Sequence, residues 1–184
     1  MVRRSLLQGL ALMLLLWALG GAPARAQGIE LGHLELQRQD GELTLDFDAR
    51  LTLPKSVEDA MQRGVPVYFV ADAALYRNRW YWRDERVARV QRSWRVAYQP
   101  LTSTWRVGFG GFNQSFQTLA EALAVVSRSS RWKIIDTSQL DPDSRYYLDF
   151  SYRLDNSQLP SPMQLGLGGQ AEWVLGVERT LRLD

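Results

Sequence analysis

The sequence has no cysteine and only one histidine, His33, among its 184 residues. The absence of cysteine excludes a disulfide scaffold, a thiol nucleophile and a lipid anchor on a thiol. With one histidine, a Ser-His-Asp triad could form only around His33. Structural zinc sites need four Cys or His ligands, which the sequence does not supply. We therefore expect a protein that is not an enzyme of these classes and that holds no metal or cofactor.

The sequence also lacks a large excess of charge of one sign. It contains 22 basic and 20 acidic residues. Loss of an N-terminal leader with Arg3, Arg4 and Arg25 would leave 19 basic against 20 acidic residues. Nucleic-acid-binding domains usually carry a clear basic excess, so we expect no nucleic-acid partner.

Long apolar runs are absent except at the N-terminus, where the pattern predicts a signal peptide over residues 1–26. Arg3 and Arg4 precede the apolar stretch Leu6–Leu19, and Ala24-Arg25-Ala26 is a small-x-small cleavage pattern. The run is shorter than the roughly 20 apolar residues of a spanning helix, which disfavours the alternative of an uncleaved anchor. We expect cleavage before Gln27, a periplasmic product and only transient membrane contact, with general secretory export favoured over the twin-arginine route.

Residues 27–184 predict a single, mainly β domain. Apolar and polar residues alternate strictly over 42–53, as in a half-buried strand. A strand over 29–38 with a bulge at Gly32-His33 precedes it, and Asp40-Gly41 predicts the hairpin between the two. Further strands are predicted over 65–75, 86–99, 105–109, 132–136, 146–154, 163–167 and 173–183, with helices over 54–63 and 118–126, the second opened by a Thr118/Glu121 capping box.

These elements predict an antiparallel β-sandwich of about nine strands with two short helices. Short turns between successive strands favour antiparallel pairing, and one polar face per strand means that each sheet buries one side. A single curved sheet covered by the two helices is the alternative.

One stretch has an unusual composition. Residues 77–106 contain eight arginines against only Asp84 and Glu85. The planar guanidinium binds carboxylate or phosphate and stacks on aromatic rings. We therefore expect an anionic glycan, a lipid headgroup or an acidic protein surface as partner, and the candidate partner-binding residues are Arg77, Arg79, Trp80, Trp82, Arg83 and Arg86.

The alternative for this stretch is structural. Trp80 and Trp82 would then fill the core, while the arginines would pair with Glu42, Asp46 and Asp48 on facing strands. The sequence does not decide whether the two tryptophans are buried or exposed.

Asp46 and Asp48 are the one feature that could support catalysis. They lie on the same face of the strand over 42–53, so they could serve a carboxylate-dependent hydrolase of envelope polymer. They also belong to a regularly alternating polar face, and we interpret them as solvated surface residues.

Several short motifs together resemble an exported Gram-negative family, domain of unknown function 4390. They are Gly64-Val65-Pro66, Arg79-Trp80-Tyr81-Trp82 with Asp84, Leu101-Thr102 before Trp105-Arg106-Val107, and Ser157-Gln158-Leu159-Pro160 with Pro162 and Gln164. Met163, where leucine is expected, is a mild departure. The resemblance brings no established activity, cofactor or catalytic residue.

We therefore expect a non-enzymatic periplasmic binding module for a protein or an anionic envelope component. A hydrolase of envelope polymer and a purely structural envelope protein are the alternatives. Neither the identity of the partner nor the oligomeric state can be predicted from the sequence.

Overall fold

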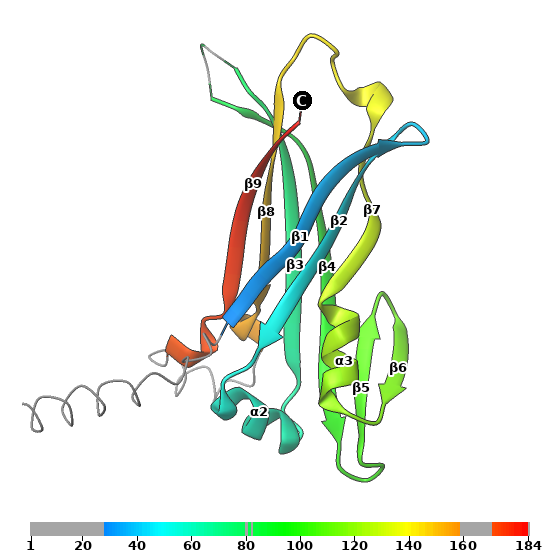
Figure 1. The fold of residues 1–184 in the computed structure, drawn as a ribbon, viewed down its shortest axis with the longest axis vertical. Coiled ribbons are helices and arrows are strands. Elements are labelled where there is room, and N and C mark those ends of the chain that lie inside the picture. Colours follow the sequence, from blue (N-terminus) through cyan, green and yellow to red (C-terminus); the bar gives the residue numbers. More distant parts are fainter. Residues whose placement is uncertain (1–27, 80, 82, 159–170, 184) are drawn as a thin grey trace, which may run out of the picture.

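Two antiparallel β-sheets face each other in the computed structural model, which describes residues 28–79, 81, 83–158 and 171–183 (Figure 1). The smaller sheet has three strands and the larger has six. This arrangement confirms the predicted sandwich and rules out the single curved sheet. Within the described part of the chain, no helix is long and apolar enough to span a membrane.

The three-stranded sheet has the order β1-β2-β7. Its strands are β1 (Gly28–Gln39), β2 (Glu42–Thr52) and β7 (Arg128–Asp136). Asp40 and Gly41 both have positive φ, 52° and 78°, as the two-residue turn between β1 and β2 requires. The register of β1 against β2 shifts between Leu31 and His33, so the predicted bulge is confirmed.

The six-stranded sheet has the order β6-β5-β4-β3-β8-β9. The strands β3, β4 and β5 are consecutive, as predicted. The bounds are β3 (Val67–Arg77), β4 (Glu85–Gln99), β5 (Thr104–Phe109), β6 (Phe112–Phe116), β8 (Tyr146–Leu154) and β9 (Gly176–Leu183).

Two short helices close gaps between the sheets. Helix α2 (Lys55–Gln62) follows β2, and helix α3 (Leu119–Val126) packs against β5 and β6. The predicted capping box is present, because the Thr118 side chain accepts from the Glu121 backbone and the Glu121 carboxylate accepts from the Thr118 backbone. Three single 3₁₀ turns complete the described chain: η1 (Thr137–Gln139), η2 (Asn156–Gln158) and η3 (Ala171–Trp173).

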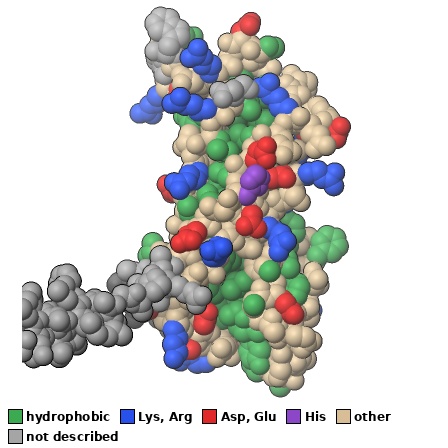
Figure 2. Space-filling model, viewed as in Figure 1, with side chains coloured by type: hydrophobic (Ala, Val, Ile, Leu, Met, Phe, Trp, Pro, Cys, Tyr) green, Lys and Arg blue, Asp and Glu red, His purple; other side chains and the backbone are tan. Residues whose placement is uncertain are grey.

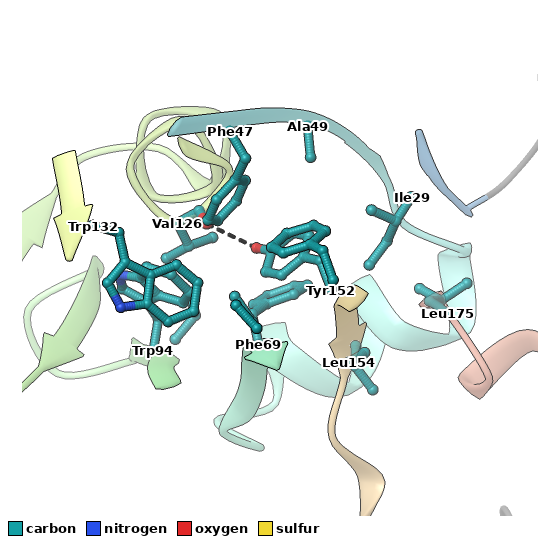
Figure 3. Close-up of a cluster of buried hydrophobic side chains, with 14 of the residues drawn as sticks. Ile29, Phe47, Ala49, Phe69, Trp94, Val126, Trp132, Tyr152, Leu154 and Leu175 are labelled. Carbon is teal, nitrogen blue, oxygen red and sulfur yellow. Dashed lines mark hydrogen bonds between the residues drawn. The ribbon is translucent and has the colours of Figure 1, made fainter. Parts of the chain in front are cut away.

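Aromatic side chains form the centre of the core (Figure 3). The ring of Phe47, from the small sheet, lies 5.4 Å from the ring of Tyr152 and 5.1 Å from that of Phe150, both from the large sheet. The buried Tyr152 hydroxyl donates a hydrogen bond of 2.8 Å to the carbonyl of Val126 at the end of α3. The two sheets and α3 thus meet around one tyrosine.

The observed strands differ from the predicted ones at β6 and at the start of β9. Strand β6 was not predicted, because Phe112–Phe116 reads FNQSF and has a glutamine where an apolar residue would continue the alternation. The predicted strand over 163–167 lies outside the described residues. Trp173 lies in the 3₁₀ turn η3, and β9 begins only at Gly176.

Candidate binding surface

The predicted arginine stretch lies at one end of the sandwich, where β3 turns back into β4. This hairpin loop and the loop that leads into β8 lie at the same end (Figure 1). The backbone amide of Asn78 donates to the carbonyl of Arg145 over 2.8 Å and so joins the two loops. The strand pairing brings Arg77 opposite Glu85 on β4 and opposite Tyr146 on β8.

Glu85 holds two of the predicted binding residues. Its carboxylate accepts hydrogen bonds from the guanidinium groups of both Arg77 and Arg79. The hydrogen bond from Arg77 is the main cause that lowers the pKa of Glu85, against the opposing effect of burial. Arg77 also lies 3.9 Å from the carboxylate of Asp141. Arg77 and Arg79 are therefore both ion-paired at this end of the molecule, where they share one carboxylate.

Asp84 fixes the hairpin loop to the neighbouring strand. It accepts a 3.1 Å hydrogen bond from the backbone amide of Arg79 and a 2.8 Å hydrogen bond from the hydroxyl of Tyr147 on β8. Burial, aided by the hydrogen bond to Asp84, raises the pKa of Tyr147 to about 12. The Tyr147 ring stacks on Tyr76, with centroids 5.3 Å apart and planes inclined by 15°.

Four further arginines at this end have no acidic partner in the part of the chain that the structure describes: Arg83, Arg86, Arg145 and Arg182. All four are exposed. The strand register places Arg86 beside Tyr76 and Arg182 beside Tyr147, so the two cations flank the tyrosine pair across four strands.

We call this surface the arginine-rich end, defined by Arg77, Arg79, Arg83, Arg86, Arg145 and Arg182. An open cavity of about 630 Å³ adjoins it, lined by Arg77, Asn78, Arg79, Tyr81, Asp141, Asp143, Ser144 and Arg145. Figure 2 shows basic side chains gathered over this end of the molecule. Of the four arginines without an acidic partner, only Arg145 lines this cavity. Guanidinium groups exposed in this way can bind carboxylate or phosphate groups.

Of the six predicted binding residues, Arg77, Arg79, Arg83 and Arg86 lie together at this end. Trp80 and Trp82 lie outside the described residues, so their burial stays undecided. Sequence reasoning missed Arg145, in the loop just before β8, and Arg182 on β9, which join the site only through strand order. No local sequence signal marks them.

The alternative predicted that these arginines pair with Glu42, Asp46 and Asp48, and none of these three pairings occurs among the contacts that the structure describes. Glu42 instead accepts a 2.7 Å hydrogen bond from Lys133, and Asp46 accepts one of 2.7 Å from the backbone amide of Arg131. The arginines find partners nearer by: besides the Glu85 contacts, Arg89 lies 2.9 Å from Asp72 on the adjacent strand.

Arg92 behaves differently from the other arginines of the stretch. Its guanidinium lies 5.2 Å from the Trp132 ring and 5.7 Å from the Phe109 ring, and it donates to the hydroxyl of Ser129. Burial lowers its pKa. Arg92 therefore belongs to the packing between β4 and β7, and this explains the one break in the apolar face of β4.

The residues of the hydrolase hypothesis lie on the outer face of the small sheet. The pairing of β1 with β2 places Asp46 opposite Glu35 and Asp48 opposite His33. The His33 side chain is 56% exposed and lies 3.3 Å from the Glu35 carboxylate. Within the described ranges, no group of three or more His, Cys, Asp or Glu side chains could hold a metal ion.

The comparisons with known proteins agree with the predicted resemblance. No curated protein and no solved structure matches the chain. One family model, described as Domain of unknown function (DUF4390), matches residues 26–182. The match covers nearly the whole predicted domain, and the chain therefore belongs to this family.

Proposed function

We propose that this protein is an exported, non-enzymatic binding protein that attaches to an anionic component of the cell envelope through its arginine-rich end. The observation that carries the proposal is the set of four exposed arginines that have no acidic partner among the described residues, two of which, Arg86 and Arg182, flank the Tyr76–Tyr147 pair. The leader pattern of residues 1–26 supports export. The absence of cysteine and the single histidine support a role other than catalysis.

The chemistry favours carboxylate or phosphate groups as the ligand. A guanidinium can donate two parallel hydrogen bonds to either group, and such charge-assisted bonds are stronger than neutral ones. Arg77 and Arg79 are already bonded to Glu85, so they shape the cavity rather than supply free charge. Arg83, Arg86 and Arg145 are the residues that we expect to contact the ligand.

Two probes test binding: vesicles that contain phosphatidylglycerol and a column of immobilised polyglutamate. We expect the Arg83→Ala, Arg86→Ala, Arg145→Ala triple variant to lose retention on at least one of them, with an unchanged melting temperature. The matched control is Arg50→Ala, Arg106→Ala, Arg153→Ala, which removes three exposed arginines away from this end and should bind as the wild type does. Equal binding by all three proteins, or equal loss in both triple variants, would contradict the proposal.

Export has its own test. N-terminal sequencing of the native protein from a fractionated cell should start at Gln27, with the protein in the periplasmic fraction. Recovery from the cytosol with Met1 still in place would contradict this part of the proposal.

A further inference from the structure

Among the strands that the structure describes, β6 has the most open edge. The other edges lie close to a strand of the opposite sheet, because β1 lies beside β9 and β7 beside β4. The β5–β6 hairpin projects past this enclosed part, and no described strand lies along the outer side of β6 (Figure 1). Its outward-pointing backbone groups are therefore available to another chain.

β6 also differs from the other edges in charge. Strands β1, β7 and β9 carry charged residues along their length, among them Glu30, Glu35, Arg128, Lys133, Glu178 and Arg182. From Val107 to Ala120, in contrast, the sequence has neither a charged residue nor a proline. Natural edge strands are usually protected against pairing by charge, proline or a bulge. The edge of β6 has none of these protections.

The turn before β6 decides which backbone groups point outward. Gly110 and Gly111 have φ of 53° and 87°, which is typical of a two-residue type I′ turn. The flanking residues Phe109 and Phe112 face each other, and hydrogen-bonded pairs then alternate along the hairpin. Phe112, Gln114 and Phe116 thus point their amides and carbonyls toward β5. The backbone groups of Asn113 and Ser115 point to the open edge.

We propose that two copies of this chain pair through their β6 strands, antiparallel and centred on Gln114. In this register Asn113 lies opposite the partner's Ser115, and Ser115 lies opposite the partner's Asn113. These are the residues whose backbone groups are free, so both form hydrogen-bonded pairs. Gln114 meets the partner's Gln114 at the two-fold axis.

The same register brings the exposed aromatic side chains together. Phe112 is 82% exposed, and it shares a face of β6 with Phe116. Antiparallel pairing about Gln114 puts Phe112 directly opposite the partner's Phe116 and repeats that contact on the other side of the axis. Cross-strand aromatic pairs stabilise a sheet, so the pairing removes an exposed phenylalanine from water.

The lack of charge favours a second copy over another protein as the occupant. A two-fold pair repeats every edge charge with the same sign a few ångströms away, and this repulsion destabilises self-pairing. The sequence FNQSF avoids this repulsion, and its two phenylalanines are placed symmetrically about Gln114. The arginine-rich end lies at the far end of the molecule from β6, so a dimer leaves both copies of it exposed (Figure 1).

Sedimentation of the protein purified from the full-length coding sequence tests the proposal. We expect a concentration-dependent dimer at up to about 1 mM protein. Gln114→Glu and Gln114→Lys each place like charges at the axis and should raise the dimer dissociation constant at least about tenfold. An equimolar mixture of the two variants should recover the dimer, because opposite charges then meet.

Two more variants separate the edge from the fold. Ser115→Pro removes an outward-pointing amide but no hydrogen bond to β5, so we expect a monomer with the wild-type melting temperature. Gln91→Glu adds the same charge as Gln114→Glu at an exposed position of β4 and should leave the dimer unchanged. A wild type that stays monomeric at all concentrations would overturn the proposal. Dimers of Gln114→Glu and Ser115→Pro as tight as the wild type, or a mixture of charge variants without recovery, would overturn it as well.

Discussion

The aromatic core and the arginine-rich end hold their residues together by different means. At the core, Phe47 is 2% exposed and contacts the rings of Trp94, Trp132, Phe150 and Tyr152. At the arginine-rich end, Arg77 and Arg79 share the carboxylate of Glu85, and all three side chains are between 29% and 42% exposed. Burial of aromatic surface holds the core together, whereas solvent-exposed ion pairs hold the arginine-rich end together.

The difference shows where stability and binding are located in this molecule. Exposed ion pairs contribute little to folding because water and salt screen them. For the same reason, an exposed arginine without an acidic partner destabilises the fold little. The surface can therefore keep such arginines free to bind a ligand. We therefore expect core substitutions to change stability and substitutions at the arginine-rich end to change binding.

Phe47→Ala should have the largest effect. It removes a buried ring that touches both sheets, and such substitutions cost about 3–5 kcal/mol. Urea unfolding followed by tryptophan fluorescence measures the loss. Leu101→Ala, at a fully exposed position, is the control and should cost less than about 0.5 kcal/mol. Equal losses of unfolding free energy in the two variants would contradict the view that the aromatic core is the main source of stability.

Tyr152→Phe should have an intermediate effect and sharpens the account of the core. It keeps the ring but leaves the Val126 carbonyl without its donor, at a cost of about 1 kcal/mol. Tyr147→Phe removes a hydroxyl that donates to exposed Asp84 instead, and it should cost less. Both are measured by the shift of the thermal midpoint. A larger loss in Tyr147→Phe would place part of the fold's stability at the arginine-rich end.

Glu85→Gln should have the smallest effect on stability at neutral pH. The pKa of Glu85 is lowered from 4.5 by Arg77, so its contribution to stability is full above pH 4.5 and is lost as pH falls through the lowered value. The variant lacks this titration, and its melting temperature should fall less steeply between about pH 5 and pH 3. The control Glu178→Gln should keep the wild-type slope.

The same variant should strengthen the binding of anions. Without the carboxylate of Glu85, Arg77 and Arg79 lose the acidic partner that they share and become more available to a ligand. Retention on the polyglutamate column at neutral pH should therefore increase. Weaker retention would show that Glu85 positions the arginines for binding rather than neutralising them.

Local sequence patterns predicted most of the fold. The strict alternation of 42–53, the turn at Asp40-Gly41 and the capping box at Thr118 each depend on neighbouring residues, and all three are confirmed. Strand β6 was missed because the backbone pairing with β5, rather than a pattern of apolar side chains, makes it a strand.

The candidate site was predicted only in part. The composition of residues 77–86 marked Arg77, Arg79, Arg83 and Arg86, but it did not show that Glu85 would compensate two of them. Arg145 and Arg182 joined the surface because β8 and β9 follow β3 in the sheet. Strand order depends on contacts between distant segments, and no local pattern encodes it.

By itself, the sequence determined that the domain is mainly β, that no disulfide holds it together and that one stretch is rich in arginine, because periodicity and composition are properties of the chain alone. Only the tertiary structure decided which arginines keep free charge and which strand edge stays open. Both depend on which segments become neighbours when the two sheets bury their apolar faces.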